Sequence, residues 1–205
     1  MTLTFQDEDF PHSLRKIGSD CPPMIYCMGD ISLLQPCNNL VAVIGARAAS
    51  PAGVGKAYEL GRQFAKEGSV VVSGLALGCD KAAHEGCLDA EGKTIAVVAS
   101  GLNIIHPKGN APLQRRILEN GGLIVSEHPF GVKANPTRLI ARNRLQAALS
   151  QSVILAECPV HSGSMHTMRF ARKYGKQCFA ASYPEYSDIN SGNELLLRLN
   201  LAQPI

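Results

Sequence analysis

The sequence predicts an α/β protein of the Rossmann-like, doubly wound class, with a mostly parallel sheet and a short N-terminal extension. Two observations lead to this prediction. From residue 40 onward, short runs of Val, Ile, Leu and Ala alternate with longer stretches of mixed polarity, which is typical of strands joined by helices. The apolar runs also lack strict polar alternation, so we expect a sheet that is covered on both faces.

The first 39 residues differ from the rest of the chain, because several prolines interrupt them and no long periodicity is present. We expect a short helix near Leu14, a strand over 24–28 and a turn at 29–30. This extension is expected to pack on the main domain, residues 40–205, rather than to form a domain of its own.

In the main domain the pattern of strand, turn and helix repeats six times. Glycines at positions 68, 92, 121 and 175 each follow a predicted helix, where a left-handed residue is needed to end it. The predicted strands are 41–45, 70–74, 94–99, 122–126, 152–157 and 177–181, and the predicted helices are 51–67, 79–90, 111–120, 138–149, 163–174 and 193–199.

Composition narrows the functional class only slightly. The net charge of +3 is too small to indicate a nucleic-acid binder by itself. Seven scattered cysteines form no C-x-x-C pair, so we expect no metal site and a reduced, cytoplasmic protein. The polar, acidic start does not resemble a signal peptide, and no apolar run reaches membrane-spanning length.

Three predicted strands end in turns of small residues that open a helix. Each such turn combines unpaired backbone N–H groups with the positive end of a helix dipole, which favours an anion and above all phosphate. No G-x-G-x-x-G pattern is present, so a dinucleotide is disfavoured, and we expect no cofactor. The residues concerned are Gly45, Ala46 and Arg47; Ser73, Gly74 and Gly78; and Ser162, Gly163 and Ser164.

A cluster of basic residues belongs to the same edge of the predicted sheet. Arg142, Asn143 and Arg144 lie on the helix that follows the fourth strand, and we interpret them as further phosphate ligands rather than as a solvated face. Two carboxylates, Glu127 and Glu157, end strands at this edge. Paired carboxylates are compatible with glycosidic chemistry, while the nearby arginines favour a scaffold of ion pairs equally well.

Two residues after the second turn are open to structural and functional interpretations. Asp80 is expected to cap the helix that it opens, since an acidic side chain there satisfies free backbone N–H groups. His84 follows four residues later on the same face of that helix. We interpret it as a partly buried packing residue rather than as an acid–base group, and we predict no catalytic residue in this chain.

These motifs, in this order, resemble the DprA/Smf family, the DNA-processing proteins of bacterial transformation. The resemblance runs from Phe10-Pro11 to about Asn193. It is carried by the stretch 22–30, Gly45-Ala46-Arg47, Ser73-Gly-Leu-Ala-x-Gly-x-Asp80 followed by Ala82-Ala-His84, Gly101-Leu102, Pro107 with Asn110, Ser126-Glu127 with Pro129, Arg142-Asn143-Arg144, Glu157, Ser162-Gly-Ser164 with Thr167, and Gly192-Asn193.

The resemblance implies a Rossmann-like core that binds single-stranded DNA with little sequence preference. It also implies a homodimer that loads a RecA-type recombinase onto that DNA, with no membrane partner. The residues of the three turns, together with Arg142, Asn143 and Arg144, would line the DNA pocket. Phosphate contacts of this kind give binding that depends strongly on salt.

The chain departs from the family pattern at a few positions. Leu77 and Glu85 stand where the family commonly has arginines, and Ser182-Tyr183 replaces a usual Pro-Gly. We expect a minimal core, without the winged-helix and N-terminal helical domains of the family.

Two alternative functions remain open. A phosphoribohydrolase of the LOG type would need P-G-G-x-G-T-x-x-E, whereas residues 161–167 have no glutamate closely following them. A sensor of a small nucleotide would fit the reduced positive charge at positions 77 and 85.

Overall fold

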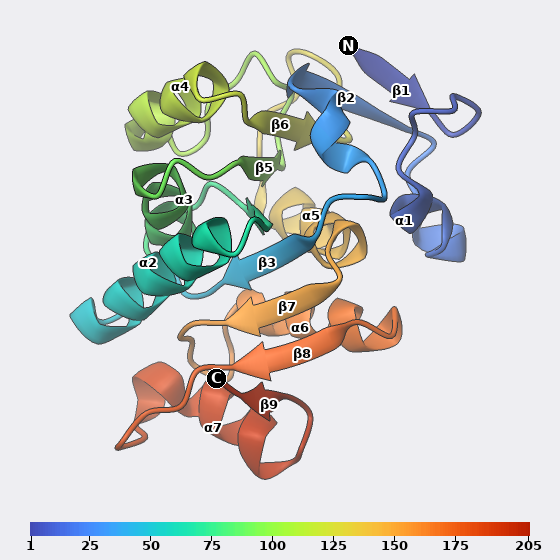
Figure 1. Cartoon of the computed structure of the whole chain (residues 1–205). Coiled ribbons are helices and arrows are strands. Elements are labelled where there is room, and N and C mark those ends of the chain that lie inside the picture. The colour runs from blue at the N-terminus through green and yellow to red at the C-terminus, as the bar shows by residue number, and fades with distance from the viewer.

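The computed structural model describes residues 1–205 and contains one nine-stranded sheet with helices on both faces (Figure 1). The strands are β1 (Thr2–Thr4), β2 (Met24–Gly29), β3 (Leu40–Ile44), β4 (Val70–Ser73), β5 (Thr94–Val98), β6 (Leu123–Ser126), β7 (Ser152–Leu155), β8 (Gln177–Ala180) and β9 (Gln203–Pro204). The helices are α1 (His12–Arg15), α2 (Pro51–Lys66), α3 (Cys79–Asp89), α4 (Ala111–Glu119), α5 (Pro136–Leu149), α6 (Ser164–Lys173) and α7 (Ser191–Arg198).

The predicted fold class is confirmed. All six strands and six helices of the main domain are present, with ends that differ from the prediction by two residues at most. The helix near Leu14 and the strand beginning at Met24 are also present. The sequence does not predict the two terminal strands, β1 and β9, because three and two residues are too few to show a hydrophobic pattern typical of a strand.

The strand order is β1-β2-β6-β5-β4-β3-β7-β8-β9. From β6 to β9 every neighbouring pair is parallel, whereas β2 pairs antiparallel with β6 and β1 antiparallel with β2. The extension therefore continues the sheet. The chain winds outward from β3 to β6, crosses back through α5, and winds in the other direction from β7 to β9. The order thus reverses between β3 and β7, and α/β proteins bind ligands at such a point.

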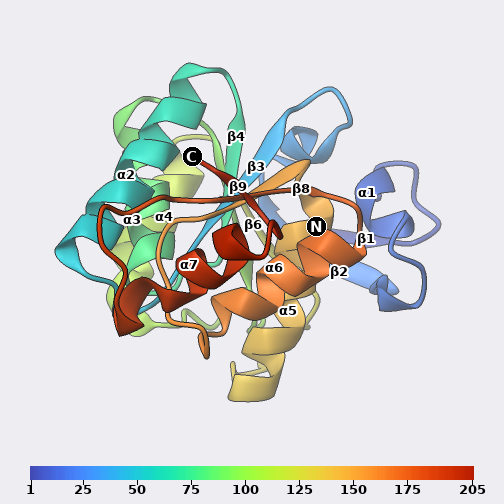
Figure 2. The same ribbon diagram turned by 90° about the horizontal axis from the view of Figure 1, so that it is seen from below.

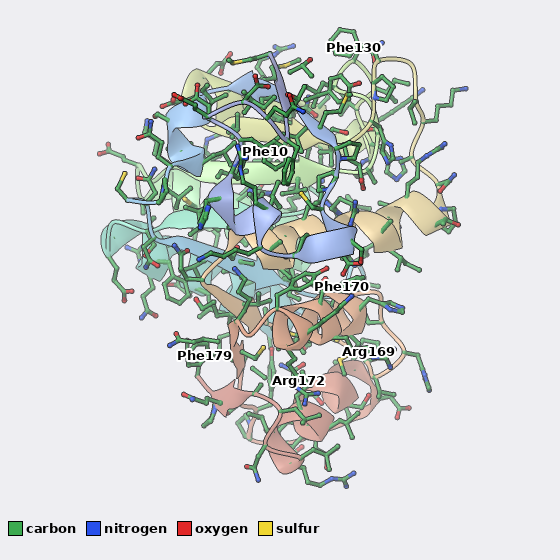
Figure 3. All side chains as sticks on the ribbon, turned by 90° about the vertical axis from the view of Figure 1, so that its right-hand side faces the viewer. Phe10, Phe130, Arg169, Phe170, Arg172 and Phe179 are labelled. Carbon is green, nitrogen blue, oxygen red and sulfur yellow. The ribbon has the colours of Figure 1, made fainter.

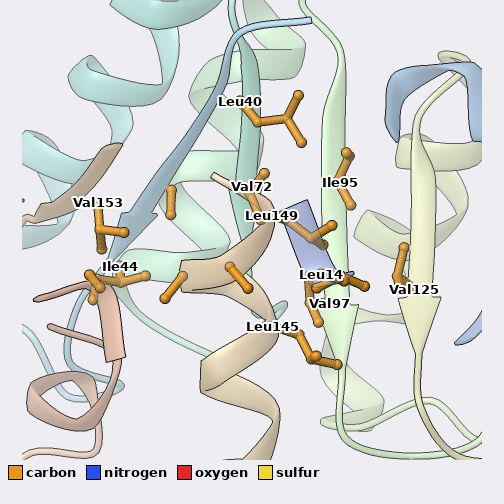
Figure 4. Close-up of a cluster of buried hydrophobic side chains, with 14 of the residues drawn as sticks. Leu14, Leu40, Ile44, Val72, Ile95, Val97, Val125, Leu145, Leu149 and Val153 are labelled. Atoms are coloured by element: carbon orange, nitrogen blue, oxygen red, sulfur yellow. The ribbon is translucent and has the colours of Figure 1, made fainter. Parts of the chain in front are cut away.

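The apolar residues of the strands alternate between two cores, because successive side chains point to opposite faces. On one face, Leu40, Val72 and Val153 pack with Leu14 of α1 and Leu149 of α5 (Figure 4). On the other, residues such as Val41, Val71 and Ile154 pack with α2 and α3, and a smaller cluster packs with α4. Figure 2 shows α5, α6 and α7 together on one side of the sheet and α2, α3 and α4 on the other. No helix is long and apolar enough to cross a bilayer.

The helices α2 and α3 approach each other closely through glycines. A Cβ atom at Gly86 would collide with the carbonyl oxygen of Tyr58, and one at Gly61 would collide with that of Ala83. We predict that Gly86→Ala lowers the free energy of unfolding by about 1–3 kcal/mol, because the two backbones must separate. Urea denaturation monitored by circular dichroism measures the change.

Gly55, on the partner helix α2, provides a matched control. It is exposed, and nothing lies within 4 Å of a Cβ atom built there. Gly55→Ala should therefore stabilise the protein by roughly 0.5–1 kcal/mol, since alanine favours the helix. Equal effects of the two substitutions would contradict close packing as the reason for Gly86.

Candidate functional site

A cleft of about 380 Å³ opens at the point where the strand order reverses, beyond the carboxyl ends of β3 and β7. Its walls come from the turn after β3, the start of α5 and the start of α6. Ten of its fifteen lining residues carry polar groups or belong to the predicted turns. The lining residues are Ile44, Gly45, Arg47, Ala76, Asp80, Pro136, Leu139, Ile140, Arg142, Asn143, Gln146, Ser162, Gly163, Ser164 and Thr167.

The turn after β3 forms one wall, and its first residue must be glycine. A Cβ atom at Gly45 would lie 2.6 Å from the Cβ atom of Cys79 and 2.8 Å from the carbonyl oxygen of Glu157. The backbone N–H of Ala46 donates to that same carbonyl over 2.7 Å. The turn is thereby tied to β7 and α3, and it presents the side chain of Arg47 to the cleft. Arg47 is exposed, and its guanidinium takes part in no ion pair or hydrogen bond within the chain.

The start of α6 forms the opposite wall. The hydroxyl of Ser164 donates to the carbonyl of Gly45 over 2.7 Å, which joins the two walls. The amide of Asn143 on α5 donates to the carbonyl of Gly163 over 3.1 Å. Both bonds aim the first turn of α6, with its partial positive charge, into the cleft. An anion placed between this helix end and Arg47 would face positive charge on both sides.

The floor of the cleft contains the buried guanidinium of Arg142, which is 3% exposed. Its Nη1 atom donates to the carbonyl of Gly74 over 2.7 Å and also to that of Val97. Gln146, with its amide oxygen turned inward, accepts from the same Nη1 over 3.1 Å and from the N–H of Gly74 over 3.0 Å. The Nε atom of Arg142 has no partner.

The charge of Arg142 is retained although it is buried. Burial lowers its pKa to about 10, and the positive charge of Arg47 acts in the same direction, while the carboxylate of Asp80 opposes both. Arg142 therefore stays protonated at neutral pH. The cleft accordingly combines one buried cation with the carboxylate of Asp80 beside it, one exposed cation and one helix N-terminus.

Asp80 was expected to cap α3, and that expectation is wrong. The N-cap position is occupied by Gly78, which has no side chain to cap the helix, and Asp80 lies within the first turn. The carboxylate of Asp80 instead accepts from the N–H of Gly74 over 3.1 Å, because the turn between β4 and α3 folds back over the first turn of the helix. Burial raises the pKa of Asp80, and the charge of Arg142 counteracts this effect.

The same turn is held against the turn after β3. Gly78 has φ +71°, and a Cβ atom there would collide with the carbonyl oxygen of Ala46. Leu75 also has a positive φ of 56°, and the buried amide of Asn110 donates to its carbonyl over 2.9 Å. Ser73 lies below this turn, fully buried, with its hydroxyl donating to the carbonyl of Val43 over 2.7 Å. Ser73 and Gly78 thus shape the cleft without lining it.

Arg144 does not join the cleft. Its guanidinium forms a two-bonded ion pair with Glu127, with distances of 2.7 and 2.6 Å, and its Nε atom donates to the carbonyl of Asp20 over 2.8 Å. Arg144 therefore connects α5 to the end of β6 and to the extension. The scaffold interpretation of Glu127 is confirmed. Glu157 also has a structural partner, since its carboxylate accepts from both the N–H and the hydroxyl of Ser50 at the start of α2.

Several lining residues escaped sequence reasoning. Gln146 follows Arg142 by one helical turn, so its spacing could have revealed it. Leu139 and Ile140 lack any chemical signature in the sequence, and only the path of α5 brings them to the cleft. No group of three or more His, Cys, Asp or Glu side chains is placed to hold a metal ion.

His84 packs inside the protein as predicted, but it is fully buried rather than partly buried. Its Nδ1 atom lies 2.7 Å from the hydroxyl of Thr94, and its Nε2 atom has no partner. Burial lowers its pKa from 6.5 to about 3. The folded protein therefore keeps His84 neutral below pH 6.5, while the unfolded chain takes up the proton there.

We predict that His84 makes the folded state less stable as the pH falls from about 6.5 toward 3, by up to about 1.4 kcal/mol per pH unit. Above pH 6.5 its contribution is constant, because both states are then neutral. Urea titrations of the wild type and of His84→Asn at several pH values measure this slope. The difference between the two unfolding free energies should shrink with acid, and two parallel profiles would refute the prediction.

Comparison with known proteins agrees with this architecture. Residues 1–205 match the model of the family described as DNA recombination-mediator protein A. The DNA processing protein DprA of Streptococcus pneumoniae is 40% identical over 179 residues, which are 87% of this chain and 62% of the relative. Protein Smf of Synechocystis is 35% identical over 196 residues, which are 95% of this chain and 48% of the relative. The chain spans about half the length of the curated relatives that it matches.

Solved structures show the same similarity. The X-ray structure of DprA from Streptococcus pneumoniae superposes on this chain with a TM-score of 0.91 at 34% identity. The match covers 100% of this chain and 70% of the DprA chain. DprA of Helicobacter pylori, whose structure is described for its single-stranded DNA binding mode, has a TM-score of 0.88 at 35% identity. That match covers 100% of this chain and 91% of the Helicobacter pylori chain. With the match over its whole length, this chain belongs to the family of DNA recombination-mediator protein A.

Proposed function

We propose that this chain binds single-stranded DNA in the cleft between β3 and β7 and acts as a recombination mediator without catalysing a reaction. The observation that carries the proposal is the exposed guanidinium of Arg47, which has no partner within the chain and faces the first turn of α6 across the cleft. A phosphate between them would receive a charge-assisted bond from Arg47 and backbone N–H donors from the helix.

The surroundings of the cleft favour a strand over a compact anion. A smaller cavity of about 120 Å³ adjoins the cleft and shares Arg47, Ala76 and Leu139 with it. Leu77 and Pro107 add apolar surface there. Alternating phosphates and bases need adjoining charged and apolar surfaces of this kind. Leu77 stands where the family commonly has an arginine, and it gives this cavity an apolar wall. Phosphate binding is therefore left to Arg47, Arg142 and the N-terminus of α6.

The relatives support the same assignment. The Helicobacter pylori protein, which this chain resembles over its full length, is described as binding single-stranded DNA, and the family is described as recombination mediators. We therefore assign Gly45, Ala46, Arg47, Gly74, Asn143, Ser162, Gly163 and Ser164 to the DNA-binding surface or its immediate support, with Arg142 as the buried charge below it. Arg144 would support this surface indirectly, by holding α5.

Arg47→Ala should weaken binding of oligothymidylate about tenfold or more, because a charge-assisted phosphate bond is lost. The slope of log affinity against log salt concentration should fall by about 0.7, which corresponds to one phosphate of a single strand. Fluorescence anisotropy at a series of salt concentrations measures both quantities.

Arg115→Ala is the matched control, because Arg115 is an exposed arginine on α4 that does not line the cleft. It should leave affinity and slope nearly unchanged. If Arg47→Ala behaved like Arg115→Ala, the proposed DNA site would be wrong. A wild-type slope equal to one or two phosphates would instead identify a small nucleotide as the ligand.

We further propose that the chain forms a homodimer and assists a RecA-type recombinase. The description of its family as recombination mediators supports the second part, and the family resemblance of the sequence motifs implies both. Light scattering coupled to size exclusion should give twice the mass of one chain. The protein should also accelerate the assembly of a RecA-type recombinase on single-stranded DNA that a single-strand-binding protein covers. A monomer without this effect would contradict both parts of the proposal, and Arg47→Ala should lose the acceleration while keeping the dimer.

A further inference from the structure

A second cleft lies at the opposite edge of the sheet, where the parallel strands begin. It has a volume of about 260 Å³ and forms between the extension and the main domain. The extension contributes α1 and the segment 34–38, and the main domain contributes the start of β3, the end of α5 and the residue before β8. Figure 3 shows this side of the molecule, with α1 in blue beside α5. None of this cleft's residues belongs to the DNA site described above.

The charge of this cleft is entirely positive. Lys16 comes from the extension and Lys176 from the main domain, and His12 adds a third basic side chain. None of the twelve lining residues is Asp or Glu. The five ion pairs of the protein involve other cations, for example Lys173 with Asp20, at 2.5 Å. The two lysines of the cleft thus have no counter-charge within the chain.

Lys176 is the informative residue, because its ammonium group is half-buried. It donates one hydrogen bond, to the carbonyl of Ala148 over 2.8 Å, while an ammonium group has three N–H donors. Burial lowers the pKa of Lys176, and the positive charge of Lys16 lowers it further. Burying a charge beside a like charge is unfavourable, and an anion between the two lysines would remove that penalty.

The walls of the cleft are already fixed by hydrogen bonds. The side chain of Gln151 accepts from the N–H of Leu40 over 2.7 Å and donates to the carbonyl of Asn38 over 3.1 Å. The amide of Asn38 in turn donates to the carbonyl of Ser32. These bonds leave the lysines, the imidazole of His12, the hydroxyl of Ser13 and the amide of Gln35 as the side-chain groups free to meet a ligand.

We propose that this cleft is a second anion-binding site that takes a phosphoryl group, either from the backbone of a nucleic-acid strand or from a free phosphate compound. Its volume is below the 300–1,000 Å³ or so of sites for larger organic ligands, which suits a compact group. Lysines on two sides match the charge and the several oxygens of a phosphoryl group better than the single charge of a carboxylate. The site is independent of the DNA cleft and does not rest on that assignment.

The test is an NMR titration of the isotope-labelled chain with inorganic phosphate at constant ionic strength. We expect saturable shifts of the backbone amides of Lys16, Gln151 and Lys176, separate from any shifts at the first cleft. Lys176→Gln removes the charge but keeps an N–H for the carbonyl of Ala148. Lys16→Gln removes the charge of an ammonium group that makes no hydrogen bond within the chain. Each should weaken phosphate binding here about tenfold.

Lys66→Gln is the matched control, since this exposed lysine ends α2 near the same sheet edge but on the other face. It should leave the shifts unchanged. The absence of saturable shifts, or equal phosphate affinity in the wild type and both cleft variants, would overturn the proposal and leave an acidic protein surface as the occupant. Shifts around Ser164 that persist in every variant would show that the fold is intact.

Oligothymidylate and adenosine monophosphate separate the two sources of the phosphoryl group. If a strand reaches this cleft, the salt dependence of oligothymidylate affinity should fall by about 0.7 in Lys16→Gln and in Lys176→Gln. If the ligand is a free phosphate compound, that salt dependence should stay constant, while the shifts caused by the mononucleotide at Gln151 should disappear in both variants. Either result supports the site and names its source.

Discussion

The buried guanidinium of Arg142 is the interaction on which the first cleft depends. It joins α5, on one face of the sheet, to the carbonyls of Gly74 after β4 and Val97 of β5. Asp80 of α3 brings the opposite charge from the other face and accepts from Gly74. A side chain at position 74 would collide with Arg142, so the glycine is required for the charge to reach its place. Because a buried charge is tolerated only when it is bonded, this network holds the strand ends and both layers of helices in one arrangement.

The three neighbouring residues 142–144 show how one motif serves three purposes. Successive residues of a helix point about 100° apart, so they cannot share one role. Arg142 points into the floor, Asn143 holds the carbonyl of Gly163 at the start of α6, and Arg144 pairs with Glu127 behind the cleft. The exposed positive charge is left to Arg47. This division fixes the walls of the cleft by hydrogen bonds and leaves one exposed cation at its mouth, which suits a ligand whose phosphates are bound by charge and whose bases are not read.

The extension joins the strand β6 to the helices α5 and α6. Asp20 accepts from Lys173 and from the hydroxyl of Tyr174 at the end of α6, and its carbonyl accepts from Arg144. The same segment adds β1 and β2 to the sheet beside β6 and supplies one wall of the second cleft. Its contacts explain why a stretch without long periodicity is ordered: its few apolar side chains, among them Phe10 and Leu14, are buried against the main domain (Figure 3). Phe130, at the top of the molecule in that view, is exposed and has no such role.

The sequence by itself determined the class of fold, the six strands and six helices of the main domain, and the positions of the three turns at the sheet edge. Apolar runs and glycines act locally, so their effect can be seen in a window of a few residues. Only the tertiary structure decided which charges remain free. Arg144 finds Glu127 and Asp20, and Asp80 turns to Gly74 instead of capping its helix. The two lysines of the second cleft, Lys16 and Lys176, line the same cleft although they are 160 positions apart in the sequence (176 minus 16). The physical reason is that a charge is neutralised by whatever the fold brings within a few ångströms, and sequence spacing does not contain that distance.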